Sequence, residues 1–439
     1  MKSNQNKNKT PSNHKSEYEA FRPVETPPSP AEAETPEKRP AAEPAVSAVQ
    51  PYADKPKGRK KRTGLKVFLI ILGILFVLVL LGILFVWNKL RKVNYRPAEE
   101  SYQTAALSYG TDENQVLRLE DEEEPTEAKP TKEPENGTAE ATEPDVSDLG
   151  SDEVADINKN IIDSQFGELM YDEDVFNILL LGVDSRTGDN YTRTDSMILV
   201  SVDHKHDKIY MNSLMRDLYV HLPGYGFTRL NAANVFGGPQ LLLDTVEENF
   251  RVRVDRYALV NLHSMARIID IMGGVDVTVK DYEVNALNNL IRHFNSINNE
   301  APNSGLIEAP GTYHMNGKQA VSYARIRYAG NADFERTERQ RRVLGTMFKQ
   351  MRSASLSQMN SMADAVLPQV MTNLSMGEIA GLMAQAPTIL KYELVPGRVP
   401  IPGSFSNAYV SGMAVLVPDL PMNIDFISEN VYGFTYSEQ

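Results

Sequence analysis

Aspartate and arginine residues gather where predicted strands end. Asp184 directly follows the apolar run FNILLLGV at 176–183, and Asp195 begins the next apolar run, SMILVSVD at 196–203. Arg216 follows a third strand pattern. Because ligands of open α/β sheets collect outside the carboxyl ends of strands, we expect these side chains to share one site. Carboxylates suit Mg²⁺ and guanidinium groups neutralise phosphate oxygens, so the pattern predicts a magnesium–pyrophosphate site.

The second half of the chain uses arginine in preference to lysine. Residues 174–439 contain 17 Arg and 6 Lys, whereas the preceding residues contain 7 Arg and 15 Lys. Arginine is favoured where phosphate or carboxylate is bound through two parallel hydrogen bonds. Several of these residues stand at expected strand and helix ends: Arg186, Arg193, Arg216, Arg325, Arg327, Arg336, Arg339, Arg341 and Arg342. The alternative is a set of ion pairs on solvated loops, and the residues alone leave both readings open.

Strand and helix patterns alternate through this half of the chain. Further strands are expected at 207–214, 257–262 and 273–279, and helices at 239–250, 264–272, 316–326 and 335–351. Residues 356–390 read as helical again, and 392–418 as a closing strand pair. Interleaved strands and helices predict one α/β domain at 174–439, layered α–β–α around a mixed central sheet.

The first 88 residues read as a tail and an anchor. Residues 1–63 are rich in Pro, Ala, Glu and Lys, which predicts a disordered cytoplasmic tail. The 21 residues at 67–87 carry no charge and, as a helix, extend about 31 Å, so a transmembrane helix is expected at 64–88. Seven basic residues precede this run and four follow it, which predicts a cytoplasmic N-terminus and an extracytoplasmic remainder.

The next segment reads as a tether. Residues 67–173 contain 23 acidic and 8 basic groups, and an acidic, Pro-containing extracytoplasmic linker is expected at 89–173. A flexible coil of about 80 residues has a mean end-to-end distance of about 50 Å.

Composition also excludes several kinds of site. With no cysteine, the chain has no disulfide, thiolate metal site or cysteine nucleophile. Its net charge of −13 excludes a globally basic nucleic-acid binder.

Seven ordered blocks resemble the LytR-CpsA-Psr family of bacterial cell-wall phosphotransferases. They are FNILLLGVDSR, YTRTDSMILVSVD, SLMRDLYV, RLNAANVFGG, LVNLHSMARIIDIMGGVDV, MNGKQAVSYARIRY and DFERTERQRRVLG, and they cover about residues 175–350. The resemblance implies a membrane-anchored enzyme of a Gram-positive-type bacterium. This enzyme would move an anionic glycopolymer (teichoic acid, capsule or a secondary wall glycan) from a polyprenyl-pyrophosphate carrier to peptidoglycan, with no nucleic-acid partner.

The resemblance also assigns roles to residues. Asp184 and Asp195 match the family's metal-binding and catalytic aspartates, with Mg²⁺ or Mn²⁺ as the implied cofactor, and Arg216 matches a catalytic arginine. The family's pyrophosphate-binding groups are matched by Arg186, Arg193, Arg216, Arg325, Arg327, Asp333, Arg336 and Gln340. Met215 stands where the family commonly has Pro, and Glu335 where Gly is usual, so the local loop geometry is expected to differ.

The implied reaction is attack of a peptidoglycan hydroxyl on the polymer-proximal phosphorus, with polyprenyl phosphate leaving. Positioning and electrostatics supply most of the acceleration in such transfers. Either aspartate is a candidate acceptor for the hydroxyl proton. Two alternatives stay open: a lipid-pyrophosphate hydrolase that uses water at the same site, and a non-catalytic membrane-tethered binder or regulator of wall polymer.

The carrier lipid also needs an apolar groove. Candidate walls are two apolar helix stripes, and the alternative is that both are ordinary core: Leu241, Leu242, Leu243, Val246 and Phe250 on one helix, and Ile268, Ile269 and Met272 on the other.

Overall fold

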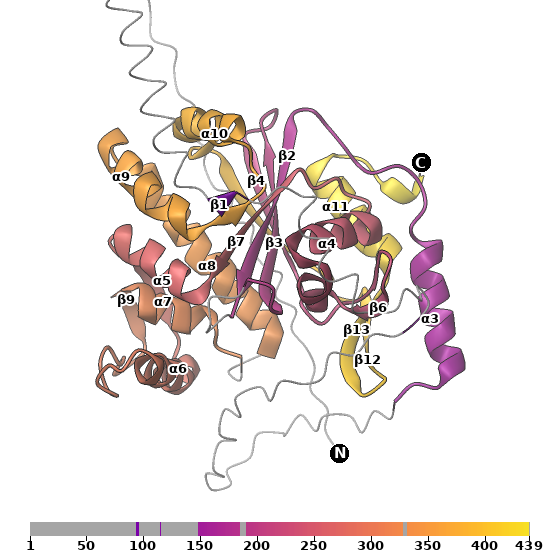
Figure 1. Cartoon of the computed structure of the whole chain (residues 1–439), viewed down its shortest axis with the longest axis horizontal. Coiled ribbons are helices and arrows are strands. Elements are labelled where there is room, and N and C mark those ends of the chain that lie inside the picture. The colour runs from indigo at the N-terminus through magenta and orange to yellow at the C-terminus, as the bar shows by residue number, and fades with distance from the viewer. Residues whose placement is uncertain (1–93, 96–114, 116–147, 185–189, 328–331, 439) are drawn as a thin grey trace, which may run out of the picture. The chain divides into compact units, whose positions relative to one another are not determined.

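The structure is a computed structural model that describes residues 94–95, 115, 148–184, 190–327 and 332–438 (Figure 1). The tail expected at 1–63, the transmembrane helix expected at 64–88 and most of the expected linker lie outside the described residues. Within the described part of the chain, no helix combines the length and hydropathy needed to span a membrane.

A seven-stranded mixed sheet forms the centre of the fold, in the order β1-β10-β7-β2-β3-β4-β11 (Figure 1). Its strands are β1 (Asn94–Tyr95), β2 (Val175–Val183), β3 (Thr194–Asp203), β4 (Lys208–Leu214), β7 (Arg256–Asn261), β10 (Met371–Thr372) and β11 (Glu393–Val399). β2 runs parallel to β7 and antiparallel to β3, while β4 runs antiparallel to β3 and parallel to β11. The expected mixed sheet is confirmed.

Helices cover both faces of this sheet, as the α–β–α expectation required (Figure 1). One face carries α4 (Ala233–Phe250) and α11 (Leu420–Val431), with α3 (Ser151–Asp163) beyond them. The other carries α5 (Leu262–Ile271), α7 (Gly317–Ala324), α8 (Ala332–Arg352), α9 (Leu356–Val366) and α10 (Met376–Ile389). β2 shows why both are needed: Leu179 and Leu181 pack in the core on the α4 side, and Leu180 packs in the cluster that includes α8.

Three strand pairs and one helix complete the described fold. They are β5 (Tyr219–Leu222) with β6 (Gly226–Arg229), β8 (Val275–Val279) with β9 (Gly311–Met315), β12 (Phe405–Val410) with β13 (Met413–Pro418), and α6 (Val284–Ile297). The sequence patterns predicted β8 but missed its partner β9, the β5–β6 hairpin, α6 and α11. The expected closing pair at 392–418 is divided, because β11 joins the central sheet and only β12 and β13 pair with each other.

α4 begins earlier than expected and is kinked. The helix runs from residue 233, but Gly237 and Gly238 leave helical geometry, and Gly238 has a φ of +70° that suits glycine. Pro239 then opens the second half, where its fixed φ and missing N–H are tolerated. The expected helix at 239–250 corresponds to this second half.

The folded domain begins before residue 174, which corrects the linker expectation for 89–173. Residues 151–163 form α3, where Ile157 packs against the main core and Ile161 is only 2% exposed. These apolar residues recur at helical spacing, yet the many acidic neighbours mask them when composition is averaged over the segment.

Both apolar stripes are buried, which favours the core alternative over an exposed lipid groove. Leu241 and Phe250 of α4 are fully buried in the core beneath the sheet, as are the other apolar residues of that stripe. A second core cluster buries Ile268 and Ile269 of α5 and Met272, which follows α5. Helical spacing therefore marked buried core residues in both places.

Candidate functional site

Asp184 and Arg325 meet although 141 residues separate them. Asp184 directly follows β2, and Arg325 is the residue that ends α7. The distance from Asp184 Oδ2 to Arg325 Nη2 is 2.6 Å. The Asn316 side chain caps the start of α7 by accepting a hydrogen bond from the Gln319 N–H, which fixes where the helix begins. The sheet and α7 thus place an ion pair at the carboxyl end of β2.

A β-bulge turns Asp195 toward the same end of the sheet. The register of β2 against β3 shifts between Gly182 and Val183, so Asp195 has no partner on β2. Bulges commonly re-aim a side chain beside an active site. Asp195 Oδ1 lies 3.0 Å from Arg216 Nη1, and Gln340 of α8 donates to the Asp195 carbonyl at 3.4 Å.

Arg216 contacts three carboxylates at once. Besides Asp195, its Nε donates to Asp217 Oδ2 at 3.2 Å, and its Nη2 lies 3.8 Å from Asp333 Oδ2. The Arg216 side chain is 10% exposed. It follows β4 with one residue between, so the strand end carries it into the site.

Asp333 joins α8 to this group. It lies in the first turn of α8, where the helix dipole favours a negative charge. Asp333 Oδ1 lies 3.2 Å from Arg336 Nη1 and 3.5 Å from Arg327 Nε. The Arg336 side chain is 4% exposed, whereas that of Arg327 is 24% exposed.

These residues form one cluster of alternating charge, here called the Asp–Arg cluster. Arg229 completes it through Asp217, with 3.6 Å between Nη1 and Oδ1. Among the described residues that make these contacts, five guanidinium groups face four carboxylates, which leaves a formal charge of +1. The members are Asp184, Asp195, Arg216, Asp217, Arg229, Arg325, Arg327, Asp333 and Arg336. Such a surplus suits an anionic ligand.

The cluster shifts two carboxyl groups in opposite directions. For Asp195, burial acts to raise the pKa, but the positive charges of Arg216, Arg336 and Arg325 together hold that pKa below its ordinary value. For Asp217, burial raises the pKa and the nearby Asp333 adds to it, so Arg216 and Arg229 only partly compensate. Asp195 therefore stays ionised at neutral pH, while the charged form of Asp217 is disfavoured.

Arg193 and Arg186 are the two remaining arginines that were expected in the site. Arg193 directly precedes β3 and is partly buried, so it stands next to the bulge that presents Asp195. Arg186 lies outside the described residues, as does Asp189 of the same loop. Arg216, Arg325, Arg327, Asp333, Arg336 and Gln340 all lie near one or both of the two aspartates, as the family resemblance implied.

The carboxylates of the cluster fit a magnesium ion only with help from other ligands. No group of three or more metal-ligating side chains exists in the described part of the chain. Asp184 and Asp195 each use one oxygen in an ion pair, and their side chains are 28% and 38% exposed. Mg²⁺ is commonly bound by one or two carboxylates, with waters and substrate phosphates completing its shell. The donor set of the two aspartates fits that mode.

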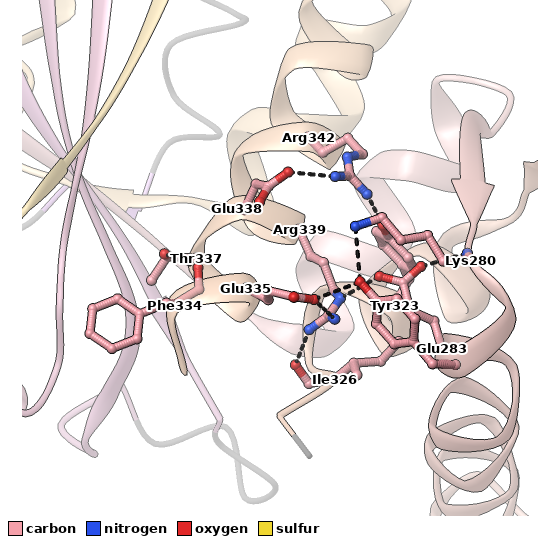
Figure 2. Close-up of polar contacts among 11 residues, drawn as sticks. Lys280, Glu283, Tyr323, Ile326, Phe334, Glu335, Thr337, Glu338, Arg339 and Arg342 are labelled. Carbon is pink, nitrogen blue, oxygen red and sulfur yellow. Dashed lines mark hydrogen bonds and ion pairs between the residues drawn. The ribbon is translucent and has the colours of Figure 1, made fainter. Parts of the chain in front are cut away.

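Arg339, which the sequence placed among the arginines at element ends but to which no site role was assigned, is buried in a polar network of its own (Figure 2). Arg339 of α8 is 1% exposed. It donates to Glu283 at 2.8 Å, to Glu335 at 2.6 Å and to the carbonyl of Ile326 at 3.0 Å. Ile326 is the residue between Arg325 and Arg327, so Arg339 fixes the backbone that carries both. In the sequence, the i, i+4 spacing of Glu335 and Arg339 was the one indication that these two side chains pair.

The two departures from the family pattern are accommodated locally. Glu335 accepts hydrogen bonds from Arg339 and from the Tyr282 hydroxyl, the latter at 3.0 Å. Met215 is 2% exposed, and its N–H donates to the Val399 carbonyl at 2.9 Å.

Comparison with known proteins gives this arrangement a family. The sequence model of the LytR_cpsA_psr family matches residues 137–421 of this chain. Biofilm regulatory protein A of Streptococcus mutans is 32% identical over 47% of this chain and 52% of its own length. The polyisoprenyl-teichoic acid–peptidoglycan teichoic acid transferase TagU of Oceanobacillus iheyensis is 33% identical over 54% of this chain and 69% of its own length. The crystal structure of TagV from B. subtilis is 26% identical, covers 60% of this chain and 100% of that chain, and gives a TM-score of 0.47. The chain belongs to the LytR-CpsA-Psr family.

Proposed function

We propose that this chain is a phosphotransferase that moves an anionic glycopolymer from a polyprenyl-pyrophosphate carrier to peptidoglycan. The observation that carries the proposal is the Asp–Arg cluster, with its surplus positive charge, in a member of this family. The similarity to TagU, a teichoic acid transferase, supports the same reaction class. The glycopolymer would be a teichoic acid, a capsule or a secondary wall glycan.

The arginines of the cluster bind the pyrophosphate head group. Arg325 and Arg327 are 20% and 24% exposed, so they meet the ligand first, and the deeper Arg216 receives it next. Each charge-assisted hydrogen bond contributes about 1.5–3 kcal/mol. When the ligand binds, its phosphate oxygens replace the carboxylates as the partners of these arginines.

The transfer forms one O–P bond and breaks another. A peptidoglycan sugar hydroxyl attacks the polymer-proximal phosphorus, and the bridging oxygen leaves with polyprenyl phosphate. We assign the hydroxyl proton to Asp195. A phosphate that engages Arg216 draws this guanidinium away from Asp195 Oδ1, which frees that oxygen to accept the hydroxyl proton.

Mg²⁺ or Mn²⁺ is part of the proposal. Asp184 and Asp195 are the residues that would hold it, and the ion would neutralise phosphate oxygens. We further propose that the uncharged run at 67–87 anchors the chain in the cell membrane, with the cluster on the extracytoplasmic side.

The test uses the purified full chain in detergent with Mg²⁺ and a synthetic polyprenyl-pyrophosphate oligosaccharide. Mass spectrometry follows products with and without peptidoglycan oligomers. Sugar phosphate joined to the peptidoglycan fragment, absent with Arg216→Ala and retained with the exposed α8 control Lys349→Ala, supports the transferase. Released sugar phosphate without an adduct indicates a hydrolase, and tight binding without turnover indicates a binder.

A further inference from the structure

Two arginines beside the Asp–Arg cluster form no close ion pair with a carboxylate of the described residues. Arg341 lies on α8 and Arg398 on β11, and neither makes an ion pair within the described ranges. Arg341 Nη1 is buried without a hydrogen-bond partner. Arg398 Nε donates to the Pro400 carbonyl at 3.2 Å, and its guanidinium lies 4.4 Å from the centre of the Phe334 ring. Arg341 therefore keeps a buried N–H group that no acceptor of the described residues satisfies.

The two side chains share one space between α8 and the sheet. Arg398 is the registered partner of Ser213 on β4, and registered neighbours project to the same face. Met211 of β4 and Leu394 of β11, at even spacing from them, pack in the cluster that includes Phe348 of α8. Ser213 and Arg398 therefore face α8. The Ser213 hydroxyl is also buried without a hydrogen-bond partner.

The electrostatics of this space are unfavourable as they stand. Burial lowers the pKa of Arg341 to about 10, the charge of Arg398 acts in the same direction, and the carboxylate of Glu338 only partly opposes them. Burial also lowers the pKa of Arg398. Glu338, one turn before Arg341, is already paired with Arg342 at 2.6 Å. Two like charges held together out of water are stabilised by an anion between them.

We propose that Arg341, Arg398 and Ser213 form a second anion subsite, which binds a phosphate group of the glycopolymer while the Asp–Arg cluster holds the pyrophosphate. Guanidinium and hydroxyl donors match phosphate oxygens. The inference rests on the proposed function.

Three sequence links place this subsite next to the cluster. Ser213 precedes Arg216 by three residues, which is about 10 Å of extended chain. Phe334, under Arg398, follows Asp333, and Gln340, which contacts Asp195, precedes Arg341. A substrate whose first repeat carries a phosphate therefore reaches both sites.

The test compares two probes on the full chain by calorimetry. One is a geranylgeranyl-pyrophosphate disaccharide, and the other is the same compound with one added glycerol phosphate. We expect the wild type to bind the second probe at least tenfold more tightly. Arg341→Gln and Arg398→Gln lose this advantage but bind the first probe within twofold of the wild type, which also shows that they are folded. Lys349→Gln, an exposed charge on the same helix, behaves as the wild type.

Equal affinity of the wild type for both probes overturns the subsite, and so does an equal loss of both probes in Arg341→Gln. Failure of the wild type to bind the first probe contradicts the proposed function instead. In that case glycerol 3-phosphate alone decides the subsite, since binding that Arg341→Gln abolishes supports it and no binding overturns it.

Discussion

Arg216 is the residue on which the site depends most, because its one guanidinium group touches Asp195, Asp217 and Asp333. A planar group with five N–H donors can serve three carboxylates from one position, and a lysine ammonium cannot do so with the same geometry. The side chain is also nearly buried, so its contacts are screened little by solvent.

Arg216→Lys is therefore expected to lower kcat/KM for transfer by at least about 10²-fold, as removal of a charge-stabilising group does in phosphoryl transfer. Steady-state product formation measures it, with Lys349→Arg as the control for an Arg–Lys exchange on the surface. Activity within threefold of the wild type would mean that Arg216 acts only as a positive charge.

Asp217 gives a prediction about pH. Its raised pKa means that the folded state binds this proton more tightly than the unfolded chain, so folding stability is lost as pH rises through the folded pKa. Asp217→Asn mimics the protonated carboxyl, so its melting temperature should exceed that of the wild type at pH 7. The difference should vanish below about pH 4, near the ordinary pKa. Thermal melts across this pH range measure it, and a less stable variant at pH 7 contradicts the account.

At the scale of elements, strand ends and helix starts assemble the site, and this part was predictable. The apolar run before Asp184 and the alternating pattern before Arg216 marked two strand ends correctly. The bulge at Gly182 and Val183 was not predictable, because it depends on how β2 and β3 pair rather than on either pattern alone.

The buried role of Arg339 was equally hidden in the sequence. The residue lies among Arg336, Arg341 and Arg342, and nothing in this run shows which guanidinium turns inward. Glu283, its buried partner, is 56 residues away and stands just before α6, which the sequence patterns missed. The contact between them exists only after the helices have packed.

The Arg339–Glu283 pair predicts an asymmetric response to mutation. Both side chains are 1% exposed, so Glu283→Ala leaves a buried charge poorly compensated and should cost about 3–5 kcal/mol of unfolding free energy. The double variant Glu283→Met, Arg339→Met removes both charges and should be less destabilised than the single one. Urea denaturation of both proteins measures the difference. A double variant that is less stable than Glu283→Ala refutes this reading of the pair.

At the scale of the whole molecule, the resemblance carried by seven ordered blocks is confirmed, since the family match spans residues 137–421. The match also begins well before 174, in agreement with a folded domain that includes α3. The acidic composition placed the predicted start of the domain too late, because three or four apolar residues at helical spacing suffice to dock a helix. Composition averaged over 89–173 does not detect them.

Two neighbouring isoleucines of α3 test this boundary. Ile161 is 2% exposed in the main core and Ile162 is 42% exposed. Ile161→Ala should lower the free energy of unfolding by about 2–5 kcal/mol, and Ile162→Ala by about 0.5 kcal/mol or less. Equal effects in denaturant titrations of the full chain would place α3 outside the cooperative fold.

The central claim is that the Asp–Arg cluster carries out the transfer, and Asp195→Asn tests it most directly. The variant is nearly isosteric but cannot accept the hydroxyl proton. The measurement is the initial rate of adduct formation between a polyprenyl-pyrophosphate oligosaccharide and peptidoglycan oligomers, followed by mass spectrometry. The account predicts a rate at least about 10²-fold below that of the wild type, with donor binding retained within tenfold. A variant that forms the adduct at the wild-type rate would contradict the account, because the transfer would then not depend on the Asp195 carboxylate.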